Sequence, residues 1–165
     1  VVVLWGDHGY DVGQKKFAKS ALWQITSRTP LVIRTPGSEP GRCHRPVSLV
    51  DLYPTLIELC GLPENPQLDG RSLKPLVDQP DARWPYPAII THSPHWHGTN
   101  HAIRGERFHY IRYADGGEEL YDMQNDPNQW RNLASDARYS EDKEQLQKWL
   151  PVSNAPHFRG KKTSE

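Results

Sequence analysis

Apolar residues in the first part of the chain fall into two short, continuous runs. Residues 1–4 form an uninterrupted run with three β-branched members, and residues 31–33 form a second run that ends at Pro36-Gly37. Runs of this kind predict strands that are buried on both faces of a parallel sheet. We expect the two strands to lie parallel to each other, with residues 20–28 forming a short helix between them.

A different pattern follows between residues 47 and 62, where apolar positions recur at three- and four-residue intervals. This spacing is that of one helix face. Pro54 fits only the first turn of a helix, so the helix is expected to start near Asp51, with Asp51 or a neighbour as its cap. Gly61 is the natural residue just beyond its end. A further short helix is expected near Leu76.

The second half of the chain alternates short apolar runs with turn residues, which predicts an antiparallel meander. These runs cover residues 101–104, 107–113 and 119–122, and residues 88–91, in the part before them, are a separate strand candidate. Residues 139–150 carry acids at the start and Lys148 near the end, the favourable order for a helix dipole, and predict a C-terminal helix. Residues 152–165 have little to bury and are expected to form an extended tail.

These elements predict an α/β fold class, in which a parallel-sheet part is followed by a small antiparallel-sheet subdomain with a C-terminal helix. The change in pattern places the boundary near residues 97–100. We therefore expect a main α/β part over residues 1–98 and a small C-terminal subdomain with its tail over residues 99–165.

Composition narrows the functional classes. The 165 residues carry no net charge, and their basic residues are dispersed, so nothing favours nucleic acid or a membrane surface as a partner. No apolar run approaches the roughly 20 residues of a membrane span. Cys43 and Cys60 could pair or remain free thiols. Because the chain begins inside an expected strand and without Met, we expect it to be a piece of a longer protein.

Candidate chemistry follows the first expected strand. Gly6 ends the apolar run, and Asp7 and His8 stand side by side before Gly9. In an open parallel sheet, ligands bind just beyond the carboxyl ends of the strands. A carboxylate beside an imidazole at that place suggests a metal site or an acid–base pair. An N-cap role of Asp7 for the next helix explains the same spacing, and both interpretations stay open.

Several motifs, taken in order, resemble the sulfatase family, which has the alkaline-phosphatase-like fold, and in particular its iduronate-2-sulfatase-like branch. The motifs are Gly6-Asp7-His8-Gly9-Tyr10 with Gly13 and Lys19, residues 48–56 with Gly61, residues 69–73, residues 107–113, residues 119–122, Asp126-Pro127 and Asn132-Leu133. The resemblance covers residues 1–150. It implies the C-terminal part of a hydrolase that cleaves a sulfate ester, with a sulfated small molecule or carbohydrate as substrate.

The resemblance also implies roles for single residues. Asp7 matches a metal ligand of the family, and His8 matches a neighbour that either binds the metal or hydrogen-bonds the sulfate. Lys19 matches the lysine that contacts the sulfate group in catalysis. The segment between Asp7 and Lys19 is one residue shorter than the commonest pattern, which leaves Lys15 and Lys16 as fallbacks. The implied cofactor is a divalent cation, Ca²⁺ first because it prefers oxygen, with Mn²⁺ or Zn²⁺ as alternatives that suit an imidazole.

The nucleophile of the family is a formylglycine made in a Cys-x-Pro-Ser-Arg motif. Cys43 precedes His44-Arg45-Pro46 and Cys60 precedes Gly61-Leu62-Pro63, so neither cysteine fits. The resemblance therefore implies that the nucleophile and further metal-binding aspartates lie upstream. On this basis the chain alone is inactive, and the remainder of the sulfatase chain is its partner. The implied location is periplasmic, secreted or lysosomal.

A histidine-rich loop, with His95, His97, Asn100 and His101, lies at the expected domain boundary. Such boundaries are favoured places for ligand sites, so Asn100 and His101 are candidate substrate-binding residues, while His95 and His97 are expected to be solvated. Two other functions remain as rivals. One is a phosphodiesterase or phosphonate hydrolase of the same fold, and the other is a non-catalytic remnant.

Overall fold

The structure is a computed structural model that describes residues 1–93 and 98–154. Its sheets in these residues are the ribbon β1–β4, the ribbon β2–β3 and the four-stranded sheet β5-β6-β7-β8. The strands are β1 (Val2–Trp5), β2 (Asp11–Val12), β3 (Phe17–Ala18), β4 (Leu31–Arg34), β5 (Ala88–His92), β6 (Asn100–Arg104), β7 (Phe108–Arg112) and β8 (Glu118–Asp122). The helices are α1 (Gln24–Ser27), η1 (Leu49–Asp51), α2 (Leu52–Leu59), α3 (Lys74–Asp78), η2 (Ala137–Tyr139) and α4 (Ser140–Gln147).

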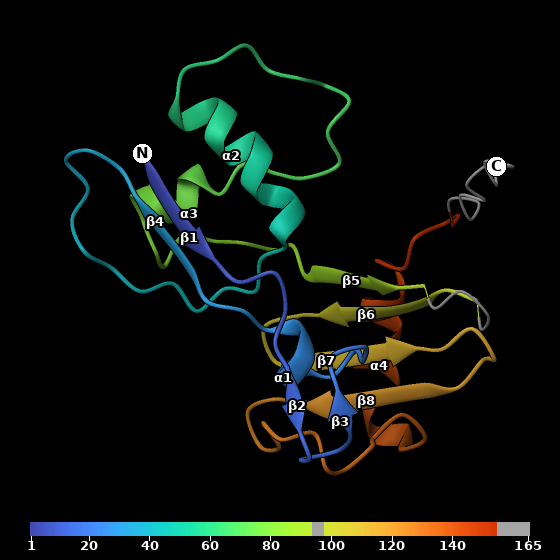
Figure 1. Cartoon of the computed structure of the whole chain (residues 1–165). Helices are drawn as coiled ribbons and strands as arrows, with labels where there is room; N and C mark the ends of the chain where they lie inside the picture. The colour runs from blue at the N-terminus through green and yellow to red at the C-terminus, as the bar shows by residue number, and fades with distance from the viewer. Residues whose placement is uncertain (94–97, 155–165) are drawn as a thin grey trace, which may run out of the picture.

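The first two expected strands exist, but the prediction that they are parallel is wrong. β1 and β4 pair antiparallel, with Val3 opposite Ile33. A parallel pair needs a long crossover that brings the chain back across one face of the sheet. Here the connection contains the short ribbon β2–β3 and the four-residue α1, which lie beyond the same ends of the two strands (Figure 1), so the chain returns in the opposite direction.

Burial of this ribbon on both faces is also wrong. Leu31 and Ile33 of β4 pack against the buried cluster of Leu73, Leu76 and Trp84. On the other face, Val2 is 66% exposed and Leu4 is 64% exposed. The ribbon therefore presents one packed face and one apolar face that is open.

The helix expected from near Asp51 is present as η1 followed by α2, and the expected cap is a capping box in which Ser48 is the N-cap residue and Asp51 its reciprocal partner. The buried Asp51 carboxylate accepts the backbone N–H of Ser48 at 2.9 Å and that of Arg71 at 2.9 Å. Gly61 follows α2 with a φ of 63°, the left-handed conformation that ends many helices. The short helix expected near Leu76 is α3.

The expected antiparallel meander is confirmed as β6, β7 and β8, and β5 joins it as a fourth strand that was not expected in the meander. The resulting sheet carries core on both faces. On one face, Ile103, Phe108, Tyr110, Leu120 and Leu133 form a buried cluster against which residues of α4 and its surroundings pack. On the other face, Leu22, Ala102, Ile111, Tyr121 and Met123 form a second cluster, with Trp23 packed beside it. The segment that precedes α1 is therefore part of the core of this sheet.

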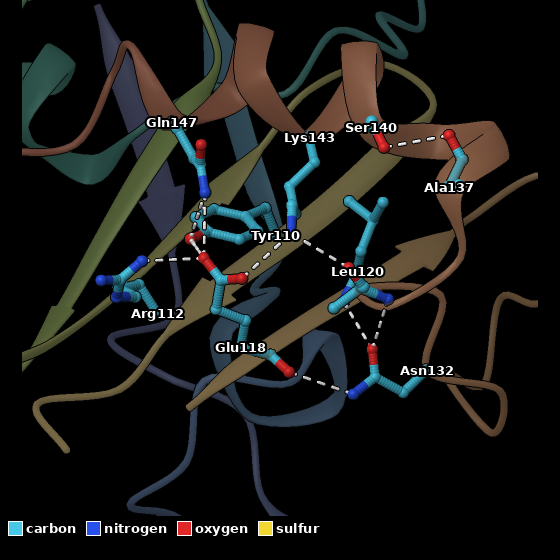
Figure 2. A network of polar contacts seen from close by, with 10 residues as sticks. Tyr110, Arg112, Glu118, Leu120, Asn132, Ala137, Ser140, Lys143 and Gln147 are labelled. Atoms are coloured by element: carbon cyan, nitrogen blue, oxygen red, sulfur yellow. Dashed lines mark hydrogen bonds and ion pairs between the residues drawn. The ribbon is translucent and has the colours of Figure 1, made fainter. Parts of the chain in front are cut away.

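A network centred on Glu118 attaches α4 to the sheet (Figure 2). The Glu118 carboxylate accepts hydrogen bonds from Tyr110 Oη at 2.6 Å, Arg112 Nη1 at 2.8 Å, Lys143 Nζ at 3.0 Å and Gln147 Nε2 at 2.9 Å. The Tyr110 hydroxyl is the largest cause that lowers the pKa of Glu118 to about 2, against the opposing effect of burial; the two cations lower it further. The ionised carboxylate thus stabilises the packing of α4.

The domain boundary expected between residues 98 and 99 lies in the connection between β5 and β6. These two strands are hydrogen-bonded neighbours, so the four-stranded sheet takes one strand, β5, from the part of the chain that was expected to form the main α/β part. Cys43 and Cys60 are free and exposed, which excludes the disulfide alternative. Within the described ranges, helices fall short of the length and apolarity that crossing a bilayer requires. Of the expected tail, residues 155–165 lie outside the described residues.

Candidate functional site

Asp7 and His8 project from a tight corner, residues 6–9, that is held on both sides by the chain around α1. The N–H of Gly6 donates to the carbonyl of Pro30 at 3.1 Å, and the N–H of Gly9 donates to the carbonyl of Thr26 at 2.8 Å. A Cβ on Gly9 would lie 2.2 Å from the carbonyl oxygen of Ile25, so only glycine fits there. We call residues 6–9 the Asp7–His8 corner.

The side chains of this corner offer two ligand atoms to solvent. The Asp7 side chain is 86% exposed, and its Oδ1 accepts only the adjacent N–H of His8. His8 Nδ1 lies 2.7 Å from the carbonyl oxygen of Gly9. Because a carbonyl can only accept, Nδ1 carries the proton and Nε2 presents its lone pair. Nε2 lies 3.6 Å from Asp7 Oδ2. The N-cap interpretation of Asp7 is wrong, since the next helix, α1, has no side-chain cap.

This donor set fits part of a divalent metal site. A histidine that binds a metal usually donates its other ring N–H to a carbonyl or carboxylate, as His8 does to Gly9. Zn²⁺ takes about four ligands and Ca²⁺ about six to eight, so two atoms do not complete a site. Over residues 1–93 and 98–154, no three His, Cys, Asp or Glu residues gather as a metal site would need. A metal ion held at this corner would therefore need further ligands beyond Asp7 and His8.

Asp11, which the sequence analysis missed, organises the loop that follows the corner. Its buried carboxylate accepts the backbone N–H groups of Gly13, Gln14, Lys15 and Lys16 at 2.7 to 3.3 Å. Burial alone would raise the pKa of Asp11, but these four donors together lower it. An Asp two residues before a Gly is a turn signal that could have identified this role.

The structure separates the three candidate lysines. The ammonium of Lys15 donates to the carbonyl of Gln129 and lies 4.8 Å from the ring centre of Trp23 and 4.9 Å from that of Tyr121. Burial lowers the pKa of Lys15, and nearby carboxylates oppose this effect. Lys16 Nζ lies 5.4 Å from the ring centre of Trp23. Lys19, directly after β3, is exposed and makes no polar contact with the described residues, so it remains the best candidate for the sulfate contact.

The two substrate-binding candidates from the histidine-rich loop occupy different surroundings. His101 is buried, with Nδ1 3.1 Å from Thr91 Oγ1 and Nε2 2.9 Å from Asn154 Oδ1. Both ring nitrogens are thus used inside the fold. Asn100 Oδ1 accepts the N–H of Ala114 at 2.9 Å, and Asn100 lines a pocket of about 280 Å³ together with Lys16. His95 and His97 lie outside the described residues.

Comparison with known families supports the resemblance found in the sequence. Residues 6–155 match the family model described as N-sulphoglucosamine sulphohydrolase, C-terminal. A protein named sulfatase from Formosa agariphila is 37% identical over 157 residues, which cover 94% of this chain and 30% of that protein. The chain thus spans about a third of the length of the relatives that it matches.

Superposition on solved structures agrees with the sequence comparison. A protein solved in complex with its substrate D-glucosamine-2-N,6-O-disulfate superposes with a TM-score of 0.73 at 25% identity, over 88% of this chain and 32% of the other. A phosphonate monoester hydrolase from Silicibacter pomeroyi superposes with a TM-score of 0.72 at 27% identity, over 88% of this chain and 33% of the other. The fold of this chain is therefore that of the C-terminal part of such hydrolases.

Proposed function

Because this chain belongs to the sulfatase family, we propose that it is the C-terminal part of a metal-dependent enzyme that hydrolyses sulfate esters. The observation that carries the proposal is the Asp7–His8 corner. The side chains of Asp7 and His8 are exposed, their candidate ligand atoms lie 3.6 Å apart, and backbone contacts hold the corner on either side. This arrangement suits a cation that is shared with ligands from another part of the protein.

In the proposed site, Asp7 Oδ2 and His8 Nε2 hold a divalent cation. Ca²⁺ is the first choice because it prefers oxygen ligands, and Mn²⁺ or Zn²⁺ are the alternatives because they also accept an imidazole ligand. When bound, such a cation withdraws charge from the non-bridging and leaving oxygens of the ester. Lys19 places its ammonium against the same oxygens, and a flexible point charge suits a tetrahedral oxyanion. The loop built on Asp11 and the strand β3 set the position from which Lys19 reaches the site.

The proposal assigns the nucleophile, a formylglycine, to the remainder of the protein, and it therefore expects the isolated chain to be inactive. The open apolar face of the β1–β4 ribbon supports this division. Val2, Leu4 and Val32 are all more than half exposed there. Contiguous apolar surface of this kind usually marks a place where other protein packs. We propose that the remainder of the sulfatase chain covers it.

As substrate we propose a sulfated carbohydrate, because a structural relative was solved with a disulfated glucosamine as its substrate. The proposal includes a periplasmic, secreted or lysosomal location, which rests on the resemblance to sulfatases. Hydrolysis of a phosphonate monoester is the second candidate, because an enzyme with that activity superposes equally well over the same share of the chain. The two candidates differ in the ester that the site prefers.

The test uses the full-length protein. Sulfate ester hydrolysis is measured beside phosphonate monoester hydrolysis, before and after metal removal by a chelator, and metal content is measured on the same samples. Asp7→Ala should lower both metal content and turnover, whereas Asp81→Ala, an exposed aspartate elsewhere, should leave both unchanged. A preference for the phosphonate ester would favour the second candidate. Normal metal content and turnover in Asp7→Ala would refute the assignment of the corner.

A further inference from the structure

Lys19, the proposed sulfate contact, has no partner among the described residues that would fix its position. Its side chain is exposed and makes no polar contact with them. The place of Lys19 therefore depends on the backbone of β3, which it directly follows. In the ribbon β2–β3, Ala18 of β3 pairs with Asp11 of β2. Whatever holds this ribbon against the rest of the molecule also sets the point from which Lys19 extends.

The loop between β2 and β3 is closed on itself by hydrogen bonds. The Asp11 carboxylate accepts the backbone N–H groups of residues 13–16. The N–H of Gly13 donates to the carbonyl of Lys16 at 2.9 Å. These contacts join residues of the loop to one another and do not reach the four-stranded sheet. The loop and β3 therefore move as one unit unless side chains attach them to the sheet.

The side chain of Lys15, in the middle of this loop, makes such an attachment. Its ammonium lies 4.8 Å from the ring centre of Trp23, 4.9 Å from that of Tyr121 and 5.5 Å from that of Trp130. A cation within about 6 Å of a ring centre is attracted by the negative face of the ring. The ammonium also donates to the carbonyl of Gln129. Lys15 thus joins the ribbon β2–β3 to the start of α1, to β8 and to the segment after β8 (Figure 1).

The groups that surround the Lys15 ammonium are held by contacts of their own. Glu119 Oε2 accepts Trp23 Nε1 at 2.8 Å and Tyr121 Oη at 2.7 Å, so one carboxylate orients two of the rings. The Gln129 side chain accepts a backbone N–H of α1 at 2.6 Å, which holds the residue whose carbonyl binds the ammonium. Because none of these contacts involves Lys15, the surrounding groups offer its ammonium one defined position.

The charge of Lys15 contributes to position more than to stability. Burial lowers its pKa, and the charges of Glu119, Asp126 and Asp11 oppose this effect. Taking an ammonium partly out of water costs free energy that an apolar side chain of similar length would not cost. An apolar side chain can slide against the rings, however, whereas an ammonium must meet the ring faces and the carbonyl oxygen together. The ammonium therefore selects one placement of the loop.

We propose that Lys15 is a positioning residue for Lys19. Its ammonium, held by three rings and the Gln129 carbonyl, fixes the ribbon β2–β3 and with it the point from which Lys19 reaches the sulfate ester. The inference rests on the proposed function, in which Lys19 binds the sulfate oxygens, and deepens it by naming the residue that places Lys19.

The geometry sets the size of the expected effect. Lys19 follows Lys15 by four positions, which is at most about 13 Å along an extended chain. A small tilt of the ribbon at Lys15 therefore displaces Lys19, and a displacement of about 1 Å at a reacting centre can slow a reaction by about 100-fold. Gln14 Nε2 also donates to Asn128 Oδ1 at 3.2 Å, so the ribbon stays partly attached without Lys15. A loss of turnover well below 100-fold follows.

The experiment uses the full-length protein and a double-mutant cycle. Lys15→Met removes the charge and keeps a long side chain, whereas Lys15→Arg keeps a cation that can meet the rings and donate to Gln129. Lys19→Met, alone and combined with Lys15→Met, completes the cycle. Lys148→Met is the control, because Lys148 is an exposed lysine that also donates a hydrogen bond, to Gln145 beside it on the last turn of the chain's C-terminal helix.

Turnover of a small aryl sulfate is measured for each variant. We expect Lys15→Met to lower kcat/KM about fivefold when Lys19 is present, and by less than about 1.5-fold in the Lys19→Met background. Lys15→Arg and Lys148→Met should both stay within about twofold of the wild type, and the urea midpoint of Lys15→Met should not fall. A purely structural role would instead lower turnover equally in both backgrounds.

Three results would overturn the inference: wild-type turnover in Lys15→Met, an equal loss with and without Lys19, or a loss in Lys15→Arg as large as that in Lys15→Met. Should Lys15→Met not fold, Trp130→Leu takes its place in the same cycle. The Trp130 side chain is 61% exposed, so its replacement removes one ring beside the ammonium and leaves the core intact.

Hydrogen exchange at the backbone amides of residues 13–18 separates this inference from the proposed function. Exchange that is at least about threefold faster in Lys15→Met than in the wild type and Lys148→Met supports the attachment of the ribbon by Lys15. This holds even if the protein hydrolyses no sulfate ester, in which case the proposed function fails alone. Sulfate ester hydrolysis that depends on Lys19, together with equal exchange in wild type and Lys15→Met, would refute the role of Lys15 alone.

Discussion

Replacing Gly9 by alanine tests how the structure holds the Asp7–His8 corner. The added Cβ would lie 2.2 Å from the carbonyl oxygen of Ile25 and 3.1 Å from its carbonyl carbon. Since a carbon and an oxygen rarely approach below 3.0 Å, the corner must move by about 1 Å away from α1. Overpacking of this kind costs about 1–3 kcal/mol. Loss of the hydrogen bond from Gly9 to Thr26 adds about 1 kcal/mol. The sum is a destabilisation of about 2–4 kcal/mol, concentrated at the corner.

Gly6 provides a matched control in the same corner. A Cβ at Gly6 would lie 3.4 Å from Pro30 Cδ, which is an ordinary contact. Gly6→Ala should therefore change stability by no more than about 0.5 kcal/mol. The assay is metal affinity of the full-length protein, measured by competition with a fluorescent chelator, together with the midpoint of urea unfolding. Changes that disturb the support of a metal ligand typically weaken affinity by about 10- to 100-fold.

We therefore expect Gly9→Ala to lose metal affinity by about that factor, and Gly6→Ala to bind like the wild type. Equal affinities for wild type and Gly9→Ala would show that the backbone contact with α1 does not position the ligands. Equal losses of metal affinity in Gly9→Ala and Gly6→Ala would show that neither position tolerates a side chain. The close approach of Gly9 to Ile25 would then not explain the loss.

Two further predictions concern the lysines and the Glu118 network. Lys19→Met should slow turnover of an aryl sulfate by about 100- to 1,000-fold, the usual effect of removing one group that stabilises developing charge. The control Lys148→Met should change turnover less than twofold, and Lys15→Met less than tenfold. A larger loss of turnover in Lys15→Met than in Lys19→Met would reverse the assignment of the sulfate contact. Glu118→Gln should lower the free energy of unfolding by about 1–2 kcal/mol at pH 7. Because folding lowers the pKa of Glu118 to about 2, its contribution is complete above about pH 5 and disappears as the pH falls toward 2. Wild type and Glu118→Gln should thus unfold alike near pH 2, and a difference that persists there would contradict the ionised state of Glu118.

The sequence correctly predicted those elements of the fold that are determined by residues close to one another along the chain. Asp51 takes part in the capping box of its helix, Gly61 ends the helix, and the three expected meander strands form, because capping, left-handed turns and alternating strands depend on neighbours in sequence. The direction of β4 could not be read in this way. Leu31 to Ile33 reads as a strand in either orientation, and the path of the chain around α1, which decides the orientation, is not encoded in the run itself.

The candidate site also contains some residues that local sequence signals indicated and others whose contacts depend on the fold. Asp7 and His8 became candidates because they follow a strand, and the resemblance alone suggested the role proposed for Lys19. His101 looked like a ligand in the sequence, yet Thr91 and Asn154 take both of its ring nitrogens, and Asn154 lies 53 residues away. The contacts of Gln129 gave no signal in the sequence, since its partners Lys15 and Gln24 lie more than 100 residues earlier.

Helix α1, only four residues long, is shared by both halves of the chain. Its Ile25 carbonyl borders the Asp7–His8 corner, while the backbone N–H of Gln24 is bound by Gln129 from the region after β8. A single inserted residue in this helix would turn one of these contacts away, because each residue rotates the helix by about 100°. The two halves are therefore joined through this one turn, so a change in its length would disturb the Asp7–His8 corner or the region after β8.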